Sequence, residues 1–265
     1  MGTLLAAALG SGITAAVLLT MGAAGDDATT TVVAPMLAPR GTAVFGQVEG
    51  SGSSASDLYR KAAPSIVFVR ARTVRTDRSP FDAGAAAADR EATGSGFVVG
   101  DGGRILTNAH VIRAATDIHV TLADGRTVAA RALGSDDASD LALLQVDEPD
   151  LPALPLGSSD AVQVGDPTVA LANPTGAAST LTTGVVSAIG QRLEASDGSS
   201  VTGVMQTDAA VSPANAGGPL LNAGGAVIGV NSHIQTGAGP VAFAVPVETV
   251  RAAIPQLEQT GHVER

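Results

Sequence analysis

Three short stretches of the sequence carry residue types that could work together in nucleophilic chemistry. A histidine follows an apolar run, an aspartate opens a second apolar run, and a glycine-rich loop comes last. A histidine can act as a general base, a carboxylate can orient it, and a tight loop can present a nucleophile. Each feature alone is more often structural, because histidines at strand ends and Gly-Pro turns are common. The stretches are Thr107–His110, Asp140–Leu143 and Thr207–Leu220.

The segments that must position these residues have the character of β-strands. Short runs rich in Val, Ile and Leu are separated by turn signals such as Gly100–Gly103 and Asp124–Gly125, and residues 73–93 are predicted to form a long loop. About a dozen short strands at such spacing predict an all-β barrel or sandwich. The expected strands are Ile66–Val69, Gly96–Val99, Arg104–Thr107, Ile118–Leu122, Thr127–Ala130, Leu141–Val146, Thr168–Ala172, Thr183–Ile189, Val204–Thr207, Ala226–Asn231 and Val241–Val245.

Two segments near the ends of this β region have helical character. The first, Leu58–Ala63, follows Asp57 as its expected N-cap and is ended by Pro64. The second, Val247–Thr260, has helical spacing that is interrupted by Pro255.

The order histidine, aspartate, glycine-rich loop is that of the two-barrel serine proteases. Further stretches resemble segments of the HtrA (Deg) family of trypsin-fold serine proteases, and the similarity covers roughly Asp57 to His262. The resemblance implies two six-stranded antiparallel β-barrels, a short C-terminal helix and a serine endopeptidase that acts on unfolded polypeptides without a cofactor. The stretches that carry it are Gly94–Val98, Leu106–Val111, Asp140–Leu144, Ala170–Gly176 with Thr175 in place of an aromatic residue, Thr182–Ser187 and Phe243–Pro246.

The nucleophile loop departs from the family pattern. The family reads Gly-Asn-Ser-Gly-Gly-Pro, whereas this chain reads Ala-Asn-Ala-Gly-Gly-Pro, with Ala216 at the serine position and Ala214 at the first glycine. A methyl group cannot attack a carbonyl, so no acyl-enzyme can form. The loss of a triad nucleophile costs about 10⁶ in turnover. An engineered change and a natural pseudoprotease both fit the sequence.

The resemblance implies roles for the remaining residues. His110 would be the general base, and Asp140 would hold its tautomer and stabilise its charge. The N–H groups of Ala214 and Ala216 would form the oxyanion hole. Alanine at position 214 can adopt fewer backbone conformations than the glycine of the family. No other hydroxyl is expected to replace the serine, since Ser212 lies up to about 13 Å away along an extended chain.

Substrate-binding residues are expected on two segments. The resemblance implies that the floor of the S1 pocket lies six residues before the nucleophile position, which is Ala210 here. This small, uncharged residue predicts small or medium aliphatic side chains before the scissile bond. The strand Ile228–Ser232, and with it Asn231 and Ser232, is expected to pair with the substrate backbone by β-augmentation.

The N-terminal part of the chain is predicted to lie outside the folded domain. Residues Leu4–Ala24 carry no charge and have about the length that crosses a bilayer. We therefore expect residues 1–25 to be a transmembrane signal anchor or a cleaved signal peptide, with a buried core helix as the weaker alternative. Residues 26–55 are expected to be a flexible linker, and residues 56–262 the protease domain, outside the cytoplasm or secreted.

Composition excludes several other functions. The 265-residue chain has a formal net charge of −10 and an aromatic content of 2%, which argues against a nucleic-acid partner. It has no cysteine, which excludes disulfides, a thiol nucleophile and a Cys-based zinc site. The acidic residues Asp136, Asp137 and Asp140 could suggest a metal, but their place in a turn before a strand fits solvated charge and one triad aspartate better. No metal or other cofactor is therefore expected.

Two further expectations come from the family resemblance. HtrA proteins usually carry a PDZ domain after the last protease helix, and this chain ends at Arg265, about where that domain would begin. We expect either a truncated sequence or a family member without a PDZ domain, and a homotrimer. Three functions stay open: a quality-control protease represented by a nucleophile-less chain, a peptide-binding or chaperone-like pseudoprotease, and a structural envelope scaffold.

Overall fold

The computed structural model describes residues 53–73, 90–194, 200–236 and 239–263. The strands of a first barrel are β1 (Ile66–Thr73), β2 (Arg90–Val98), β3 (Arg104–Thr107), β4 (Asp117–Thr121), β5 (Thr127–Asp136) and β6 (Leu141–Val146). Those of a second barrel are β7 (Pro167–Ala172), β8 (Thr180–Glu194), β9 (Ser200–Thr207), β10 (Pro219–Asn222), β11 (Val227–Thr236) and β12 (Gly239–Pro246). The helices are α1 (Ala55–Ala62), α2 (Ala109–Ile112) and α3 (Val247–Thr260), with 3₁₀ turns η1 (Ala63–Ser65) and η2 (Pro213–Asn215).

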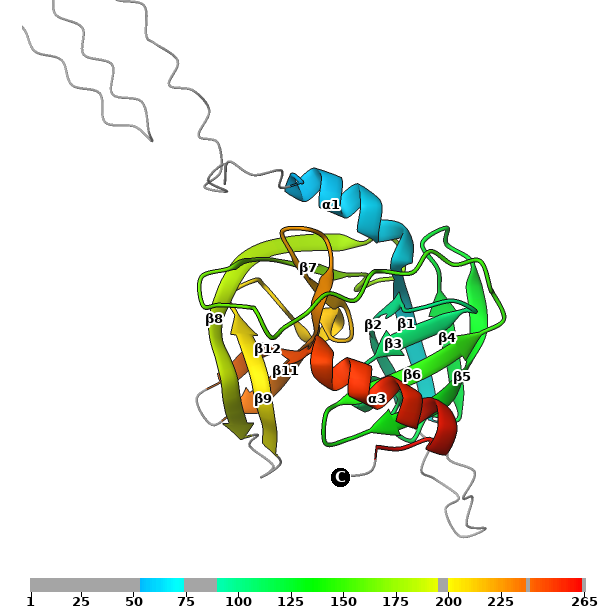
Figure 1. The fold of residues 1–265 in the computed structure, drawn as a ribbon. Coiled ribbons are helices and arrows are strands. Elements are labelled where there is room, and N and C mark those ends of the chain that lie inside the picture. Colours follow the sequence, from blue (N-terminus) through cyan, green and yellow to red (C-terminus); the bar gives the residue numbers. More distant parts are fainter. Residues whose placement is uncertain (1–52, 74–89, 195–199, 237–238, 264–265) are drawn as a thin grey trace, which may run out of the picture. The chain divides into compact units, whose positions relative to one another are not determined.

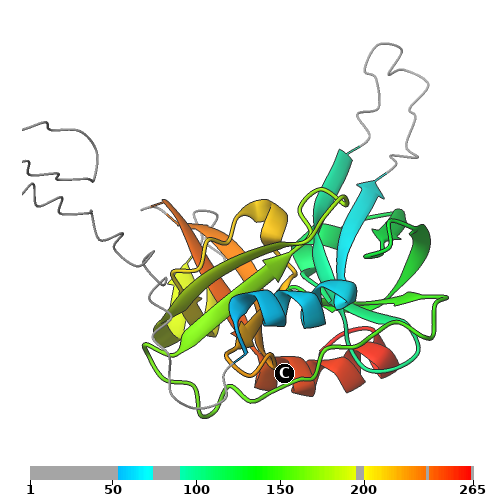
Figure 2. The ribbon, with the colours of Figure 1, turned by 90° about the horizontal axis from the view of Figure 1, so that it is seen from above.

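The two barrels are closed and lie side by side (Figures 1 and 2). Their strand orders are β1-β2-β3-β6-β5-β4 and β10-β11-β12-β9-β8-β7, and neighbouring strands are antiparallel. This confirms the expected all-β class, the two six-stranded barrels and the C-terminal helix.

Several strands differ from the sequence expectation. Residues 73–93 were expected as a loop, but β2 begins at Arg90 because residues 90–93 pair with the end of β1. Strand β10 was not expected, since it directly follows two glycines and starts with Pro219. It closes the second barrel by pairing with β7 and β11. Pairing with distant strands therefore set these boundaries, against the local composition.

The expected N-cap of the first helix was wrong by three residues. Ser54, not Asp57, is the N-cap, and its hydroxyl accepts a hydrogen bond from the Asp57 N–H at 3.2 Å. Asp57 in turn accepts from the Ser54 N–H at 3.3 Å, which completes a capping box. The helix therefore begins earlier than predicted, and Pro64 lies in η1 after its end.

Helix α3 is continuous through Pro255, where an interruption was expected. Proline removes one backbone hydrogen bond from a helix. The apolar side of α3 compensates by burial, since Val250, Ala253 and Leu257 pack into the core. Gly261 ends the helix in the left-handed conformation, with φ of 78°.

One large apolar cluster joins the two barrels. It contains Ile66 and Leu141 from the first barrel, Leu221 and Val230 from the second, and Leu58 from α1. Helices α1 and α3 run across the pair in Figure 2. Because this cluster is shared, the two barrels are held in one relative position, which a site built from both of them requires.

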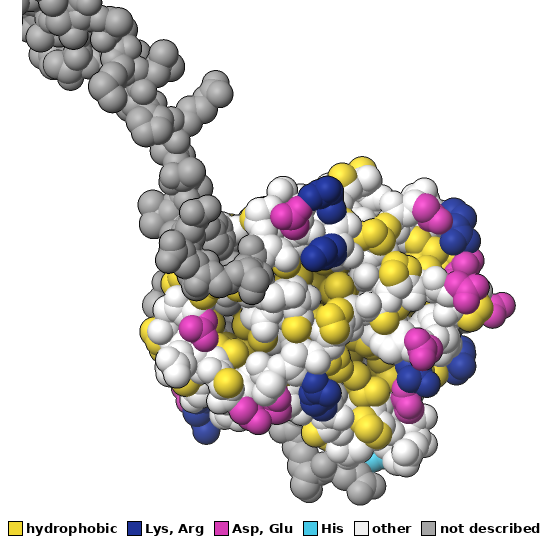
Figure 3. Space-filling model, turned by 45° about the horizontal axis from the view of Figure 1, so that its top comes forward, with side chains coloured by type: hydrophobic (Ala, Val, Ile, Leu, Met, Phe, Trp, Pro, Cys, Tyr) yellow, Lys and Arg dark blue, Asp and Glu magenta, His cyan; other side chains and the backbone are white. Residues whose placement is uncertain are grey.

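The surface carries charges of both signs. On the face in Figure 3, acidic and basic side chains lie scattered among apolar ones. Some form exposed ion pairs, such as Arg126 with Asp124 and with Glu148, each at 2.7 Å. Exposed pairs of this kind add little to stability.

The charge-free segment Leu4–Ala24 lies outside the described residues. Within the described ranges, none of the helices is both long and apolar enough to cross a membrane.

Candidate active site

His110 lies at the end of β3, in the one-turn helix α2. Asn108 precedes this helix as its N-cap. The Nδ1 atom of His110 lies 2.9 Å from each carboxylate oxygen of Asp140. This contact favours the tautomer with the proton on Nδ1, which leaves Nε2 as the nitrogen that can accept a proton. The side chain of His110 is about one-third exposed, at 33%.

Asp140 is held in an unusual backbone conformation directly before β6. Its φ is 55°, in the left-handed region that residues other than glycine seldom adopt. Its carbonyl accepts hydrogen bonds from the Asn108 side chain at 2.8 Å and from the Ala109 N–H at 3.2 Å. These bonds join the start of α2 to the turn before β6, so that His110 and Asp140 face each other.

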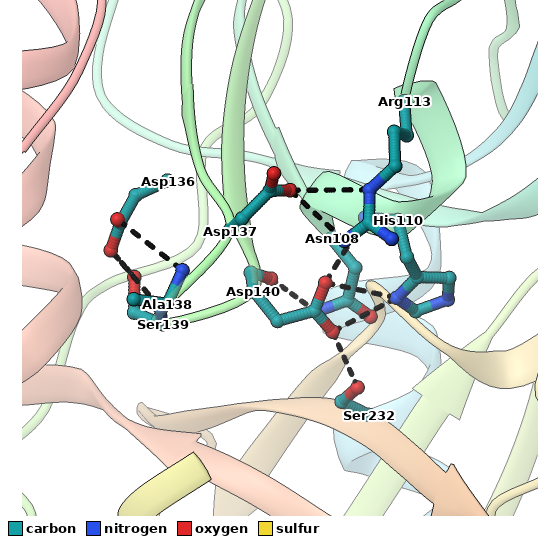
Figure 4. A network of polar contacts seen from close by, with 9 residues as sticks. All are labelled: Asn108, His110, Arg113, Asp136, Asp137, Ala138, Ser139, Asp140 and Ser232. Atoms are coloured by element: carbon teal, nitrogen blue, oxygen red, sulfur yellow. Dashed lines mark hydrogen bonds and ion pairs between the residues drawn. The ribbon is translucent and has the colours of Figure 1, made fainter. Parts of the chain in front are cut away.

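The Asp140 carboxylate accepts hydrogen bonds from three donors (Figure 4). Besides His110 Nδ1, these are the His110 N–H at 3.0 Å and the Ser232 hydroxyl at 2.7 Å. Ser232 comes from β11 of the second barrel and is fully buried. The carboxylate is nearly buried as well, with 13% of its side chain exposed. A carboxylate bonded in this way is fixed in orientation and can stabilise a positive charge on the imidazole.

The other two acidic residues of the segment 136–140, Asp136 and Asp137, have different contacts. Asp136 accepts from the backbone N–H groups of Ser139 at 3.0 Å and Ala138 at 3.4 Å. Asp137 pairs with Arg113 at 3.0 Å (Figure 4). The contacts of Asp136 stabilise the turn that presents Asp140.

The nucleophile position packs closely against the first barrel because two neighbouring residues are glycines. Ala216 is fully buried, and its carbonyl accepts from the Ser95 N–H at 2.8 Å. A Cβ at Gly217, which has φ of 88°, would lie 2.1 Å from the Ser95 carbonyl oxygen. A Cβ at Gly94 would lie 2.6 Å from Val111 and 3.2 Å from the Ala216 carbonyl oxygen. Side chains at these glycines would therefore push the loop away from β2 and α2.

The N–H of Ala216 is already engaged in a turn. It donates to the Pro213 carbonyl at 3.3 Å, and the Asn215 N–H donates to the Ser212 carbonyl at 2.8 Å. These are the bonds of the 3₁₀ turn η2, which also contains Ala214. An oxyanion hole made by Ala214 and Ala216 needs both N–H groups aimed at the substrate. In this arrangement of the loop, a peptide must rotate before the Ala216 N–H can donate to a substrate oxyanion.

Ala210, the expected S1 floor, is exposed. Its carbonyl accepts from the Thr182 hydroxyl and from the Asn215 side chain, both at 3.2 Å. These bonds tie Ala210 to β8 and to η2. A pocket floor at this position therefore depends on how the loop 210–215 is arranged.

The strand expected to bind substrate is mostly occupied. Asn231 donates its N–H to the Gly218 carbonyl and accepts from the Gly217 N–H, both at 2.8 Å, while its other neighbour is β12. Asn231 and Ser232 are fully buried. Beyond Asn231, the described part of β11 has β12 as its one strand neighbour, so the edge open to a peptide begins at Ser232 and not at Ile228 as the sequence suggested.

Two contributors were not expected from the sequence. Ser232 was expected to pair with substrate through its backbone, and its hydroxyl also donates to Asp140, which the sequence did not indicate. His233 was not singled out in the sequence, and its ring centroid lies 5.6 Å from that of His110. Burial lowers the pKa of His233, and the nearby His110 lowers it further, while Asp140 raises it. Both residues lie far from His110 in sequence, and no local motif indicates the contact.

The sequence matches the family described as "Trypsin-like peptidase domain" over residues 94–230, which include His110, Asp140 and Ala216. Among solved structures, the crystal structure of Deg5 is 33% identical with a TM-score of 0.63, and the match covers 78% of this chain and 95% of that one. A serine-to-alanine variant of the HtrA-type protease AlgW with a decapeptide is 32% identical with a TM-score of 0.69, covering 80% of this chain and 68% of the other. The chain belongs to the HtrA family of trypsin-like peptidases.

Curated HtrA relatives extend beyond the matched region. Protease Do-like 1, chloroplastic, from Arabidopsis thaliana is 40% identical over 215 residues, which are 78% of this chain and 48% of that protein. A probable periplasmic serine endoprotease DegP-like from Hahella chejuensis is 44% identical over 180 residues, which are 67% of this chain and 38% of that protein. The chain thus spans about half the length, or less, of these HtrA relatives.

Proposed function

We propose that this chain is an HtrA-type serine endopeptidase domain that binds unfolded polypeptide and, with Ala216 at the nucleophile position, does not cleave it. The observation that carries the proposal is the Asp140 carboxylate, which accepts from both His110 and Ser232. Such an arrangement orients a base toward a nucleophile and stabilises its charge. DegP-like relatives are described as serine endoproteases, and one AlgW structure contains a decapeptide.

The absence of cleavage follows from the chemistry of one side chain. With a methyl group at position 216, His110 has no hydroxyl proton to remove, and no acyl-enzyme forms. What binding and an oxyanion hole supply without a nucleophile is about 10³–10⁴ over the uncatalysed rate in water. That leaves peptide hydrolysis negligible.

The alternative is a natural pseudoprotease that holds peptides as its function. Two features favour it: Ala214 is a second departure in the same loop, and the Ala216 N–H is bonded to Pro213. A chain that needs no oxyanion hole would lose nothing by either feature.

The first test compares the full chain with its Ala216→Ser variant on fluorescently labelled casein. We expect cleavage by the variant alone, and its loss when Asp140→Asn is added. Cleavage by the unmodified chain that disappears with His110→Ala would refute the proposed role of Ala216. If neither chain cleaves and both bind unfolded casein, the pseudoprotease function is supported. If neither binds it, a purely structural role is left.

We also propose the arrangement of the rest of the chain. Residues 1–25 would be a membrane anchor or signal peptide, residues 26–55 a linker, and residues 56–262 the protease domain outside the cytoplasm. The charge-free segment Leu4–Ala24 and the periplasmic description of DegP-like relatives support this. Fractionation of cells that express the full chain, with and without external protease, tests the location. Sedimentation tests the homotrimer that we expect from the family resemblance.

A further inference from the structure

His233 places a second imidazole beside the candidate base. It follows Ser232 on β11, and its ring meets that of His110 edge to face, with centroids 5.6 Å apart and planes at 83°. The ring is half-buried. Its Nδ1 atom is buried and has no hydrogen-bond partner among the described residues. The contact therefore joins two titratable rings in a place where one of them is poorly solvated.

The surroundings decide which ring carries a proton. His110 is bonded through Nδ1 to the Asp140 carboxylate, which stabilises a charge on that ring. His233 has no such bond, and its partner across the sheet, Ala242, is uncharged. The charged groups that act on His233 are His110 from α2 and Asp140 from the turn before β6. Protonation of His233 would therefore leave a cation without a direct partner beside His110.

The position of His233 also bears on peptide binding. The edge of β11 that is open among the described residues begins at Ser232. A peptide that adds to this edge and brings its carbonyl to His110 must pass the ring of His233. Covering the ring removes water from it, which further disfavours its charged form.

We propose that His233 is a positioning residue for His110: its neutral ring packs His110 against Asp140, and its protonation adds a second charge beside His110 that opposes this packing. This inference rests on the proposed function for its catalytic part, but the coupling between the two rings does not depend on cleavage. Two unit charges 5.6 Å apart repel enough to shift a titration midpoint by about 0.5 to 2 pH units, for effective dielectric constants between water and the protein surface.

The first experiment follows the ring resonances of His233 by NMR against pH in the full, unmodified chain and in His110→Phe. We expect the midpoint of His233 to rise by about 0.5 to 2 units in the variant. His262→Phe removes a histidine whose Nδ1 contacts the Thr260 carbonyl, and should leave the midpoint unchanged. An unchanged midpoint in His110→Phe would overturn the proposal, whether or not any chain cleaves casein.

The second experiment measures kcat/KM against pH in the Ala216→Ser background. At a pH low enough to protonate both rings, two protons must leave the pair when His233 is present, so the logarithmic slope of kcat/KM should exceed one there. His233→Phe keeps a ring without a titrating group, and the acid limb of its profile should have a slope of one. His233→Ala also loses the packing, and its kcat should fall roughly 10- to 100-fold.

The proposal would be contradicted if log kcat/KM fell with the same slope at acidic pH in the chain with His233 and in His233→Phe. An unchanged kcat in His233→Ala would contradict it as well. If Ala216→Ser does not cleave at all, the proposed function fails, and the NMR titration alone decides the coupling of the two rings.

Discussion

Replacing Ala214 by glycine should accelerate the Ala216→Ser variant, because this residue controls whether the oxyanion hole can form. In the structure the Ala216 N–H donates to the Pro213 carbonyl at 3.3 Å within η2. A rotation of the peptide between Pro213 and Ala214 by about half a turn would release that N–H. The same rotation would turn the Ala214 N–H to the opposite side, where it could act as the second donor.

The magnitude follows from the backbone angle that this rotation demands. A 3₁₀ residue has φ of about −60°, so half a turn brings residue 214 to about +120°. That region costs a residue with a Cβ about 1–3 kcal/mol and costs glycine little. The hydrogen bond to Pro213, worth about 1 kcal/mol, is lost in both cases and cancels. Ala214→Gly should therefore raise the rate roughly 5- to 150-fold.

The assay is kcat/KM on labelled casein for the full chain with Ala216→Ser alone and with Ala214→Gly added. Ala223→Gly, in an exposed turn, serves as the control for a general loosening of the backbone. Equal rates with and without Ala214→Gly would refute the reasoning, because the rotation would then not limit the reaction. A gain of similar size in the control would refute it as well.

Three further predictions concern stability and pH. Gly217→Ala should destabilise the fold by about 2–5 kcal/mol in urea unfolding, because φ is positive and the added Cβ would clash with the Ser95 carbonyl oxygen. The control Gly125→Ala, with φ of 86° and open space around it, should cost only about 1–2 kcal/mol. Ser54→Ala should lower stability by about 1 kcal/mol through loss of the capping box, and an unchanged urea midpoint would contradict the assigned cap. Because burial lowers the pKa of His233 below 6.5, the unfolded chain binds more protons than the native state just below that pH. The unfolding free energy should thus fall as the pH drops from 7.5 to 5.5, and His233→Phe should reduce that fall; an equal fall in both chains would exclude His233 as its source.

Local sequence patterns predict much of this fold because barrel strands bury apolar side chains and end at turn residues. The runs Leu141–Val146 and Thr168–Ala172 are almost fully buried and were expected as strands. Boundaries that depend on a distant partner were not predictable in this way. Residues 90–93 are mostly polar, yet they extend β2 because the end of β1 lies beside them.

The residues of the candidate site could be predicted from the sequence to a similar extent. His110 and Asp140 stand in short motifs whose order is informative, and the structure brings them together. Ser232 was noticed for another reason, and its bond to Asp140 spans 92 residues of sequence. The contact of His233 with His110 likewise depends on how the two barrels meet.

The sequence by itself determines the chemistry at position 216, because a methyl group has no nucleophilic oxygen in any conformation. It also determines that residue 214 carries a Cβ, and with it the range of backbone angles open to the loop. Only the tertiary structure decides that the Ala216 N–H is turned to Pro213, that Ser232 bonds Asp140 and that His233 packs on His110. The physical reason is that covalent identity is local, whereas hydrogen-bond partners and solvation are set by strand register and by the closure of two barrels around one core.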